Sequence, residues 1–147
     1  MTNYKPLLKN INTFVFDYDG VLTDGSVITL DDGEAYRTTN VKDGYALQLA
    51  VKKGYRVAVI SGAKADCMIH RLKALQIRDI FLGIENKLEV FNTYLSDNKI
   101  RADQVLFMGD DIPDYEVMLK SGISTCPADA AEEIRKVANY ISQAPGG

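Results

Sequence analysis

Short apolar runs that alternate with helical patterns constrain the fold of this chain more than any other feature. The apolar runs are brief, rich in β-branched and aromatic residues, and bounded by Gly or Asp: Thr13–Phe16, Arg56–Ile60, Asp79–Leu82, Val105–Met108 and Ile123–Cys126. Helical patterns lie between and after them, at about Asp43–Lys53, Lys64–Ala74, Lys87–Asp97, Pro113–Lys120 and Ala130–Val137. This alternation predicts an α/β fold, with a parallel sheet covered by helices on both faces.

One segment departs from the alternation. Val27–Leu30 and Glu34–Thr38 flank Asp31-Asp32-Gly33, which is typical of a hairpin turn because Gly adopts a positive φ easily. We expect a β-hairpin flap at about residues 26–39, near the carboxyl edge of the sheet where open α/β folds bind ligands. The last residues, Ala144–Gly147, are typical of the start of a flexible tail.

Composition restricts the class of protein. The chain has 147 residues, of which 46% are hydrophobic and 25% charged, and a formal net charge of −3. This charge indicates neither nucleic acid nor an anionic membrane surface as a partner. No apolar run approaches the ~18 residues that a membrane helix needs, and Met1–Asn10 does not resemble a signal peptide. Cys67 and Cys126 match no zinc spacing. We expect one domain over residues 1–147, located in the cytoplasm.

Acidic residues follow two of the predicted strands. Asp17-Tyr18-Asp19-Gly20 comes after the first strand, and Gly109-Asp110-Asp111-Ile112-Pro113-Asp114 comes after the fourth. Parallel strands end at the same edge of a sheet, so these carboxylates should converge. Such a group favours a hard cation with oxygen ligands, and Mg²⁺ is the usual one where phosphate is bound. Asp111 and Asp114 could instead cap the helix that begins near Pro113, which leaves Asp110 unexplained.

Two further features suit a phosphate group. Ser61-Gly62 follows the second strand and offers a hydroxyl and backbone N–H groups before a helix, although Ser is also a common helix N-cap. Lys87 opens the next helix, where a cation opposes the helix dipole. This placement is better explained by an anion in the cleft, while an exposed lysine is the simpler alternative.

Together these pieces resemble the haloacid dehalogenase (HAD) superfamily of phosphotransferases. The resemblance implies a Rossmann-like three-layer α/β/α sandwich. It also implies that Asp17 is the nucleophile and Asp19 the general acid/base, and that Ser61, with Gly62, and Lys87 hold the phosphoryl group. Asp17, the backbone carbonyl of Asp19, and Asp110 would ligate Mg²⁺, supported by Asp111 or Asp114. Larger members insert a cap domain after the first or the second motif. Here the stretch from Asp17 to Ser61 holds the flap, one helix and one strand, and the stretch from Ser61 to Lys87 holds one helix and one strand. Neither stretch has room for a cap domain, so we expect none.

Three short stretches of the sequence are similar to the 3-deoxy-D-manno-octulosonate 8-phosphate (KDO 8-phosphate) phosphatases, which are capless, Mg²⁺-dependent homotetramers. The similar stretches are residues 17–25, Asn40–Tyr45 and Gly83-x-x-Asn86-Lys87. The resemblance implies a phosphatase of lipopolysaccharide precursor synthesis. Lys42 and Arg71 are candidates for binding the sugar acid. The family often has a charged residue where this chain has Ala63, and its tail continues beyond the position of Gly147.

Other functions remain open at this point. One is a phosphatase for nonulosonate (sialic-acid-like) 9-phosphates, and another is a non-catalytic HAD-like regulatory module. The complete acid set of Asp17, Asp19 and Asp110 argues against the module. A capless enzyme could also act on phosphoproteins. We expect a small sugar phosphate as the partner, an open cleft, and neighbouring subunits that help to close it.

Overall fold

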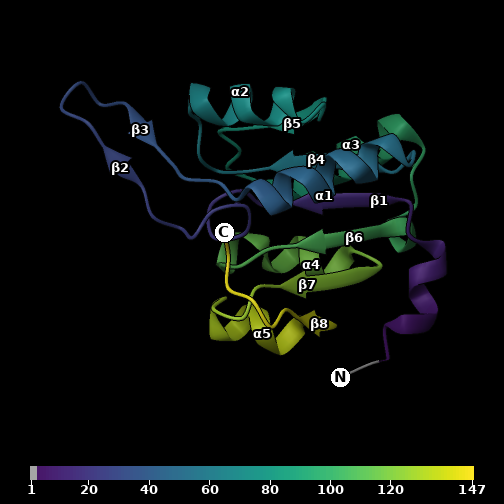
Figure 1. The fold of residues 1–147 in the computed structure, drawn as a ribbon. Helices are drawn as coiled ribbons and strands as arrows, with labels where there is room; N and C mark the ends of the chain where they lie inside the picture. Colours follow the sequence, from purple (N-terminus) through teal and green to yellow (C-terminus); the bar gives the residue numbers. More distant parts are fainter. Residues whose placement is uncertain (1–2) are drawn as a thin grey trace.

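A parallel sheet organises the molecule. The structure, a computed structural model, describes residues 3–147. The sheet has six strands in the order β5-β4-β1-β6-β7-β8 (Figure 1). Their bounds are β1 (Thr13–Phe16), β4 (Arg56–Ile60), β5 (Asp79–Phe81), β6 (Val105–Met108), β7 (Ile123–Cys126) and β8 (Tyr140–Ile141). Thr13 is in register with Arg56 on one side and with Val105 on the other, so β1 lies in the middle of the sheet.

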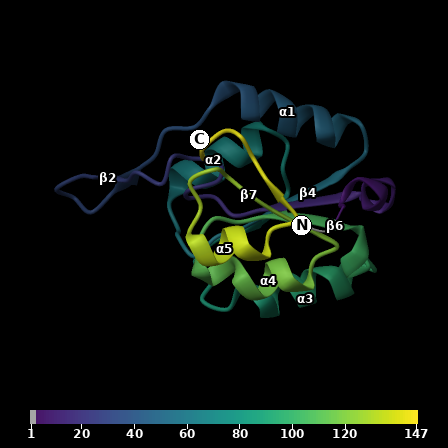
Figure 2. The same ribbon diagram turned by 90° about the horizontal axis from the view of Figure 1, so that it is seen from below.

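Helices cover both faces of this sheet (Figure 2). The helices α1 (Val41–Lys52) and α2 (Asp66–Ala74) lie on one face, and α3 (Lys87–Asn98), α4 (Tyr115–Lys120) and α5 (Glu132–Val137) lie on the other. Short 3₁₀ turns complete the elements: η1 (Lys5–Asn10), η2 (Ala102–Gln104) and η3 (Ile112–Asp114). The predicted three-layer α/β/α fold without a cap domain is confirmed. No helix within residues 3–147 has the length and apolar character needed to cross a bilayer.

Each face of the sheet has its own apolar core. Leu47 of α1 and Leu72 of α2 pack with Val59 on one face, while Phe91 of α3 packs with Phe107 on the other. Val57–Ile60 of β4 are all buried, as expected for a strand with helices on both sides. The two cores hold the strands rigidly, and so fix the residues that follow the strand ends.

The predicted flap is present and shorter than expected. Its strands β2 (Ile28–Thr29) and β3 (Ala35–Tyr36) are antiparallel and project from the carboxyl edge of the sheet (Figure 1). Gly33 in the turn has a φ of 87°, which explains the glycine at this position. The strands are short because each has only the other to pair with.

Close packing explains the glycine at position 122 and corrects the prediction for the end of the chain. Gly122, which follows α4, lacks the positive φ of a left-handed helix cap. A Cβ there would lie 2.6 Å from the backbone oxygen of Asp103, so close approach explains the glycine. The predicted flexible tail packs against the body instead. The N–H of Gly146, which is buried, donates to Asp129, and the N–H of Gly147 donates to the Val21 carbonyl.

Candidate active site

The carboxyl ends of β1, β4 and β6 open into one cleft of about 390 Å³. Its walls include most of the residues that the sequence singles out: Asp17, Asp19, Ser61, Gly62, Lys87 and Asp110. The expected convergence of the acidic and phosphate motifs therefore occurs. The volume suits a small-molecule ligand.

Asp17 occupies the centre of the cleft, directly after β1. Its N–H donates to the carbonyl of Met108 at 2.9 Å, which ties its backbone to β6. Its buried side chain accepts a hydrogen bond from the N–H of Tyr18 at 2.7 Å and lies 2.9 Å from Lys87 Nζ. Burial, together with the charge of Asp114, raises the pKa of Asp17 to about 6, although Lys87 acts in the opposite direction.

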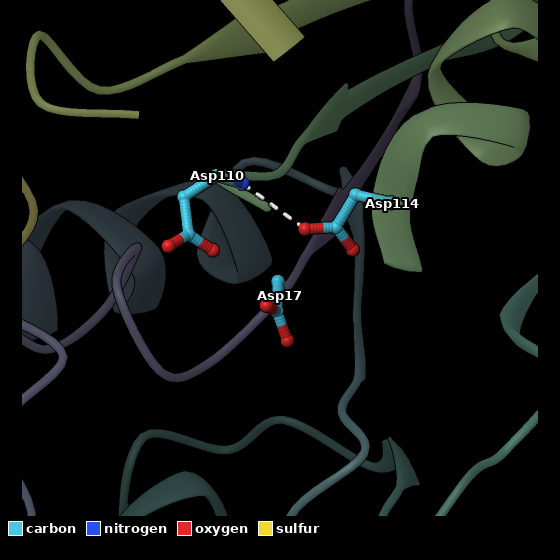
Figure 3. Close-up of side chains that lie close together, drawn as sticks. All are labelled: Asp17, Asp110 and Asp114. Carbon is cyan, nitrogen blue, oxygen red and sulfur yellow. Dashed lines mark hydrogen bonds between the residues drawn. The ribbon is translucent and has the colours of Figure 1, made fainter. Parts of the chain in front are cut away.

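Lys87 and Asp114 form the buried base of the site. Lys87 Nζ lies 2.7 Å from Asp114 Oδ1. The other Asp114 oxygen accepts from the N–H of Asp110, as Figure 3 shows, and also from the N–H of Asp111. Burial lowers the pKa of Lys87, but Asp114 and Asp17 outweigh it and hold the pKa above its usual value. Lys87 is buried and faces two carboxylates, so the alternative of an exposed lysine is wrong, while its binding of a phosphate group stays a prediction.

Asp110 completes a cluster of three carboxylates. One oxygen from each of Asp17, Asp110 and Asp114 lies within 4.8 Å of the other two (Figure 3). Burial and the charges of Asp17 and Asp114 raise the pKa of Asp110 to about 7, and its Oδ1 is buried without a hydrogen-bond partner. A divalent cation with oxygen ligands fits this site, because it would relieve the repulsion and give that oxygen a partner.

Gly20 allows the acidic loop to approach Asp110. Its φ is 84°, and a Cβ at this position would overlap the Asp110 carboxylate. Glycine is therefore required here both by the backbone conformation and by the space available.

Ser61 lies in the wall of the cleft, directly after β4. Its N–H donates to the carbonyl of Phe81, and its hydroxyl accepts from the N–H of Ala63 at 3.3 Å. The helix α2 begins at Asp66, two residues later than predicted, and Ala65 is its N-cap. The alternative interpretation of Ser61 as a helix N-cap is therefore wrong, and its buried side chain faces the cleft with Gly62.

Arg37 is a site residue that the sequence analysis missed. It follows β3 in the flap, and its Nε and Nη2 lie 2.6 and 2.9 Å from the two carboxylate oxygens of Asp19. The signal available in the sequence was a basic residue at the base of a hairpin beside an acidic loop. The hairpin register decides whether that side chain turns toward the loop, and the sequence leaves the register open.

Three other candidates lie at the rim or outside the cleft. Asp111 is exposed and caps η3 by accepting from the N–H of Ile112 at 2.8 Å. Lys42 is exposed on α1 and lines a separate hollow. The Arg71 guanidinium packs against Gly44 between α1 and α2, with Nε buried and unpartnered. Neither Lys42 nor Arg71 lines this cleft, and their role in sugar-acid binding stays a prediction.

Comparison with known proteins places this geometry in a family. The model of the haloacid dehalogenase-like hydrolase family matches residues 34–128. The KDO 8-phosphate phosphatase of Escherichia coli is 36% identical over 139 residues, which are 95% of this chain and 74% of that protein. The chain belongs to the haloacid dehalogenase-like hydrolase family.

Solved structures of the family share the whole fold. The KDO 8-phosphate phosphatase of Yersinia pestis superposes with a TM-score of 0.95 at 30% identity, covering 99% of this chain and 78% of that one. The enzyme of Moraxella catarrhalis, in complex with a magnesium ion, a phosphate ion and a KDO molecule, gives a TM-score of 0.95 at 29% identity. That match covers 100% of this chain and 84% of the other. The resemblance stated from the motifs is thereby confirmed.

Proposed function

We propose that this chain hydrolyses KDO 8-phosphate to KDO and inorganic phosphate, with Mg²⁺ as its cofactor. As a member of the HAD-like hydrolase family whose relatives are phosphatases, it is a phosphoric monoester hydrolase. The observation that carries the proposal is the buried Asp17 carboxylate, held by Lys87 beside Asp110 and Ser61 in one cleft. The named substrate of the relatives and the bound magnesium, phosphate and KDO of the Moraxella catarrhalis enzyme support it.

In the first step Asp17 attacks the phosphorus atom of the substrate. A bond forms between an Asp17 oxygen and phosphorus, the bond from phosphorus to the sugar oxygen breaks, and Asp19 gives that oxygen a proton. Lys87, 2.9 Å from Asp17, fixes the direction of the nucleophile and supplies positive charge beside the phosphoryl oxygens. Ser61 and the backbone at Gly62, which also line the cleft, add hydrogen-bond donors.

In the second step water hydrolyses the aspartyl phosphate. Asp19 accepts a proton from the attacking water, the bond between Asp17 and phosphorus breaks, and inorganic phosphate leaves. Asp17 and Asp110, with the backbone carbonyl of Asp19, would hold Mg²⁺, while Asp114 orients Lys87 and the loop after β6. When bound, the cation neutralises charge on the transferring phosphoryl group.

The proposed assembly is a cytoplasmic homotetramer, in which residues 1–147 form one domain. The flap supports it, since Ile28 and Tyr36 pair across the hairpin and leave 58% and 47% of their surfaces exposed. A two-stranded hairpin with an apolar face is stabilised by packing against other copies. The proposed role is in lipopolysaccharide precursor synthesis.

The substrate is tested by a side-by-side kinetic comparison at saturating Mg²⁺. We expect a higher kcat/KM for KDO 8-phosphate than for a nonulosonate 9-phosphate, a hexose 6-phosphate or a phosphopeptide. A tenfold preference for any of the others, about 1.4 kcal/mol, would overturn the assignment. Hydrolysis of a generic aryl phosphate in the presence of Mg²⁺ distinguishes an enzyme from a non-catalytic module, because such a module would not hydrolyse it.

A further inference from the structure

An ion pair joins the flap to the candidate acid/base. Arg37 donates from Nε to Asp19 Oδ1 at 2.6 Å and from Nη2 to Asp19 Oδ2 at 2.9 Å. Parallel hydrogen bonds between a planar guanidinium and a planar carboxylate fix orientation as well as distance. Both oxygens of the Asp19 side chain are therefore held by a residue of the flap.

This pair is largely shielded from solvent on its Arg37 side, unlike the exposed pair Arg101–Asp103. The Arg37 side chain is 6% exposed and that of Asp19 is 27% exposed. The pair Arg101–Asp103 has matching chemistry, but its side chains are 68% and 56% exposed. Exposed pairs hold their partners weakly, whereas a shielded pair resists separation because each charge would be left without a partner.

Within residues 3–147, few hydrogen bonds besides this pair join the flap to the body. Its strands β2 and β3 pair over two residues each. A further contact runs from the Cys67 thiol to the carbonyl of Ala35 at 3.6 Å, and a thiol is a weak donor. The Arg37–Asp19 pair therefore supplies two of the three hydrogen bonds that join residues 27–38 of the flap to the rest of the described chain, and both of them end on the Asp19 carboxylate.

We propose that Arg37 is a positioning residue, which couples the position of the flap to the orientation of Asp19. Arg37 does not line the cleft, so it acts through Asp19 rather than on the substrate. The inference rests on the proposed function, in which Asp19 moves a proton to the sugar oxygen and from water. Proton transfer needs hydrogen-bond reach, and a misplacement of about 1 Å can cost about 10²-fold in rate.

Steady-state kinetics with KDO 8-phosphate and Mg²⁺ test the proposal. Arg37→Ala is expected to lower kcat at least tenfold while KM changes less than about twofold. Arg37→Lys keeps the charge and one hydrogen bond, and should recover part of the loss. Arg101→Ala is the matched control and should leave kcat and KM unchanged. An unchanged kcat in Arg37→Ala would overturn the proposal, as would a rise in KM alone, since that would indicate substrate binding.

Amide hydrogen exchange of residues 26–36 tests the coupling without substrate. Arg37→Ala and Asp19→Asn should each raise the amide exchange rate of the flap in the metal-free protein about tenfold. The double variant should exchange no faster than either single variant. Additive effects would show that the two residues act independently and would refute the coupling. If wild type fails to hydrolyse KDO 8-phosphate, the proposed function fails, while the exchange result still decides the coupling. Should Arg37→Ala not fold, Arg37→Lys serves for the kinetics, and Arg37→Lys with Asp19→Asn serves for the exchange measurement.

Discussion

At the scale of single residues, three carboxylates in one cleft impose a cost on the metal-free protein. The pKa of Asp17 is raised to about 6 and that of Asp110 to about 7, chiefly by burial. A carboxyl whose pKa is raised by folding stabilises the fold below its unfolded pKa, and this contribution is lost as the pH rises through the folded value. In EDTA, stability should therefore fall between about pH 4 and pH 7 on account of these groups.

The prediction is that Mg²⁺ stabilises the protein more at pH 8 than at pH 5. Asp110→Asn removes one charge from the cluster, so it should stabilise the metal-free protein at pH 8 by about 1–2 kcal/mol, after allowance for solvent screening. It should also abolish most of the Mg²⁺ effect. Thermal melts in EDTA and in Mg²⁺ at both pH values measure this. Asp103→Asn is the exposed control, and an equal Mg²⁺ effect at both pH values would contradict the prediction.

The nucleophile gives a second prediction at this scale. Asp17→Asn should lower kcat by roughly 10³-fold or more, because the amide cannot take up the phosphoryl group. Its circular dichroism spectrum should match that of wild type, since the side chain keeps its size. Asp97→Asn, on the exposed surface of α3, should retain full activity. Activity near wild type in Asp17→Asn would rule out the covalent mechanism.

At the scale of elements, Asp114 joins α3 to the loop after β6. It accepts from Lys87 at 2.7 Å and from the N–H of Asp110 at 3.0 Å, and it is fully buried. Asp114→Ala should lower the free energy of unfolding by about 3 kcal/mol, because it leaves a buried lysine with one partner fewer. Urea denaturation measures the loss. Asp103→Ala removes an exposed pair and should cost at most about 1 kcal/mol. Equal effects of the two variants would contradict this role for Asp114.

The strands were largely predictable where a short apolar run is buried and bounded by polar residues or glycine. The bounds of β1, β4, β6 and β7 agree with the sequence prediction because each is a buried run between polar residues. The strand β8 was missed, since Tyr140–Ile141 is too short to give a pattern. The start of α2 was predicted too early, because nothing in the residues 64–65 marks the boundary as a cap would.

The site was predictable where residues follow strand ends, and less so elsewhere. Asp17, Ser61 and Asp110 were found because parallel strands fix where the next residues lie. Arg37 was missed because its contact depends on the hairpin register. The tail was predicted as flexible from its Pro and Gly content, whereas Gly146 is buried against the loop at Gly20. Contacts between residues so distant in sequence leave no local pattern.

At the scale of the whole molecule, the exposed flap leads us to expect an oligomer. Ile28 and Tyr36 expose apolar surface on one face of a hairpin that projects from the body (Figure 1). Wild type should be a tetramer by light scattering at micromolar concentration, and Ile28→Lys with Tyr36→Lys should dissociate it. Leu119→Lys, which changes an exposed apolar residue on α4, is the control. A monomeric wild type would contradict the prediction.

The central place of β1 also has a consequence for how the chain acquires its chemistry during folding. Thr13 pairs with Arg56 of β4 and, on its other side, with Val105 of β6. The strand β1 can therefore join the sheet only when strands much later in the chain are available. Closing such long loops costs entropy before any contact is gained, which slows folding. A nascent chain that has not yet reached β6 holds Asp17 and Asp19 without Asp110 or Asp114. It therefore carries neither the repulsion of the finished cluster nor its capacity to bind a cation, and both arise together when β6 joins the sheet.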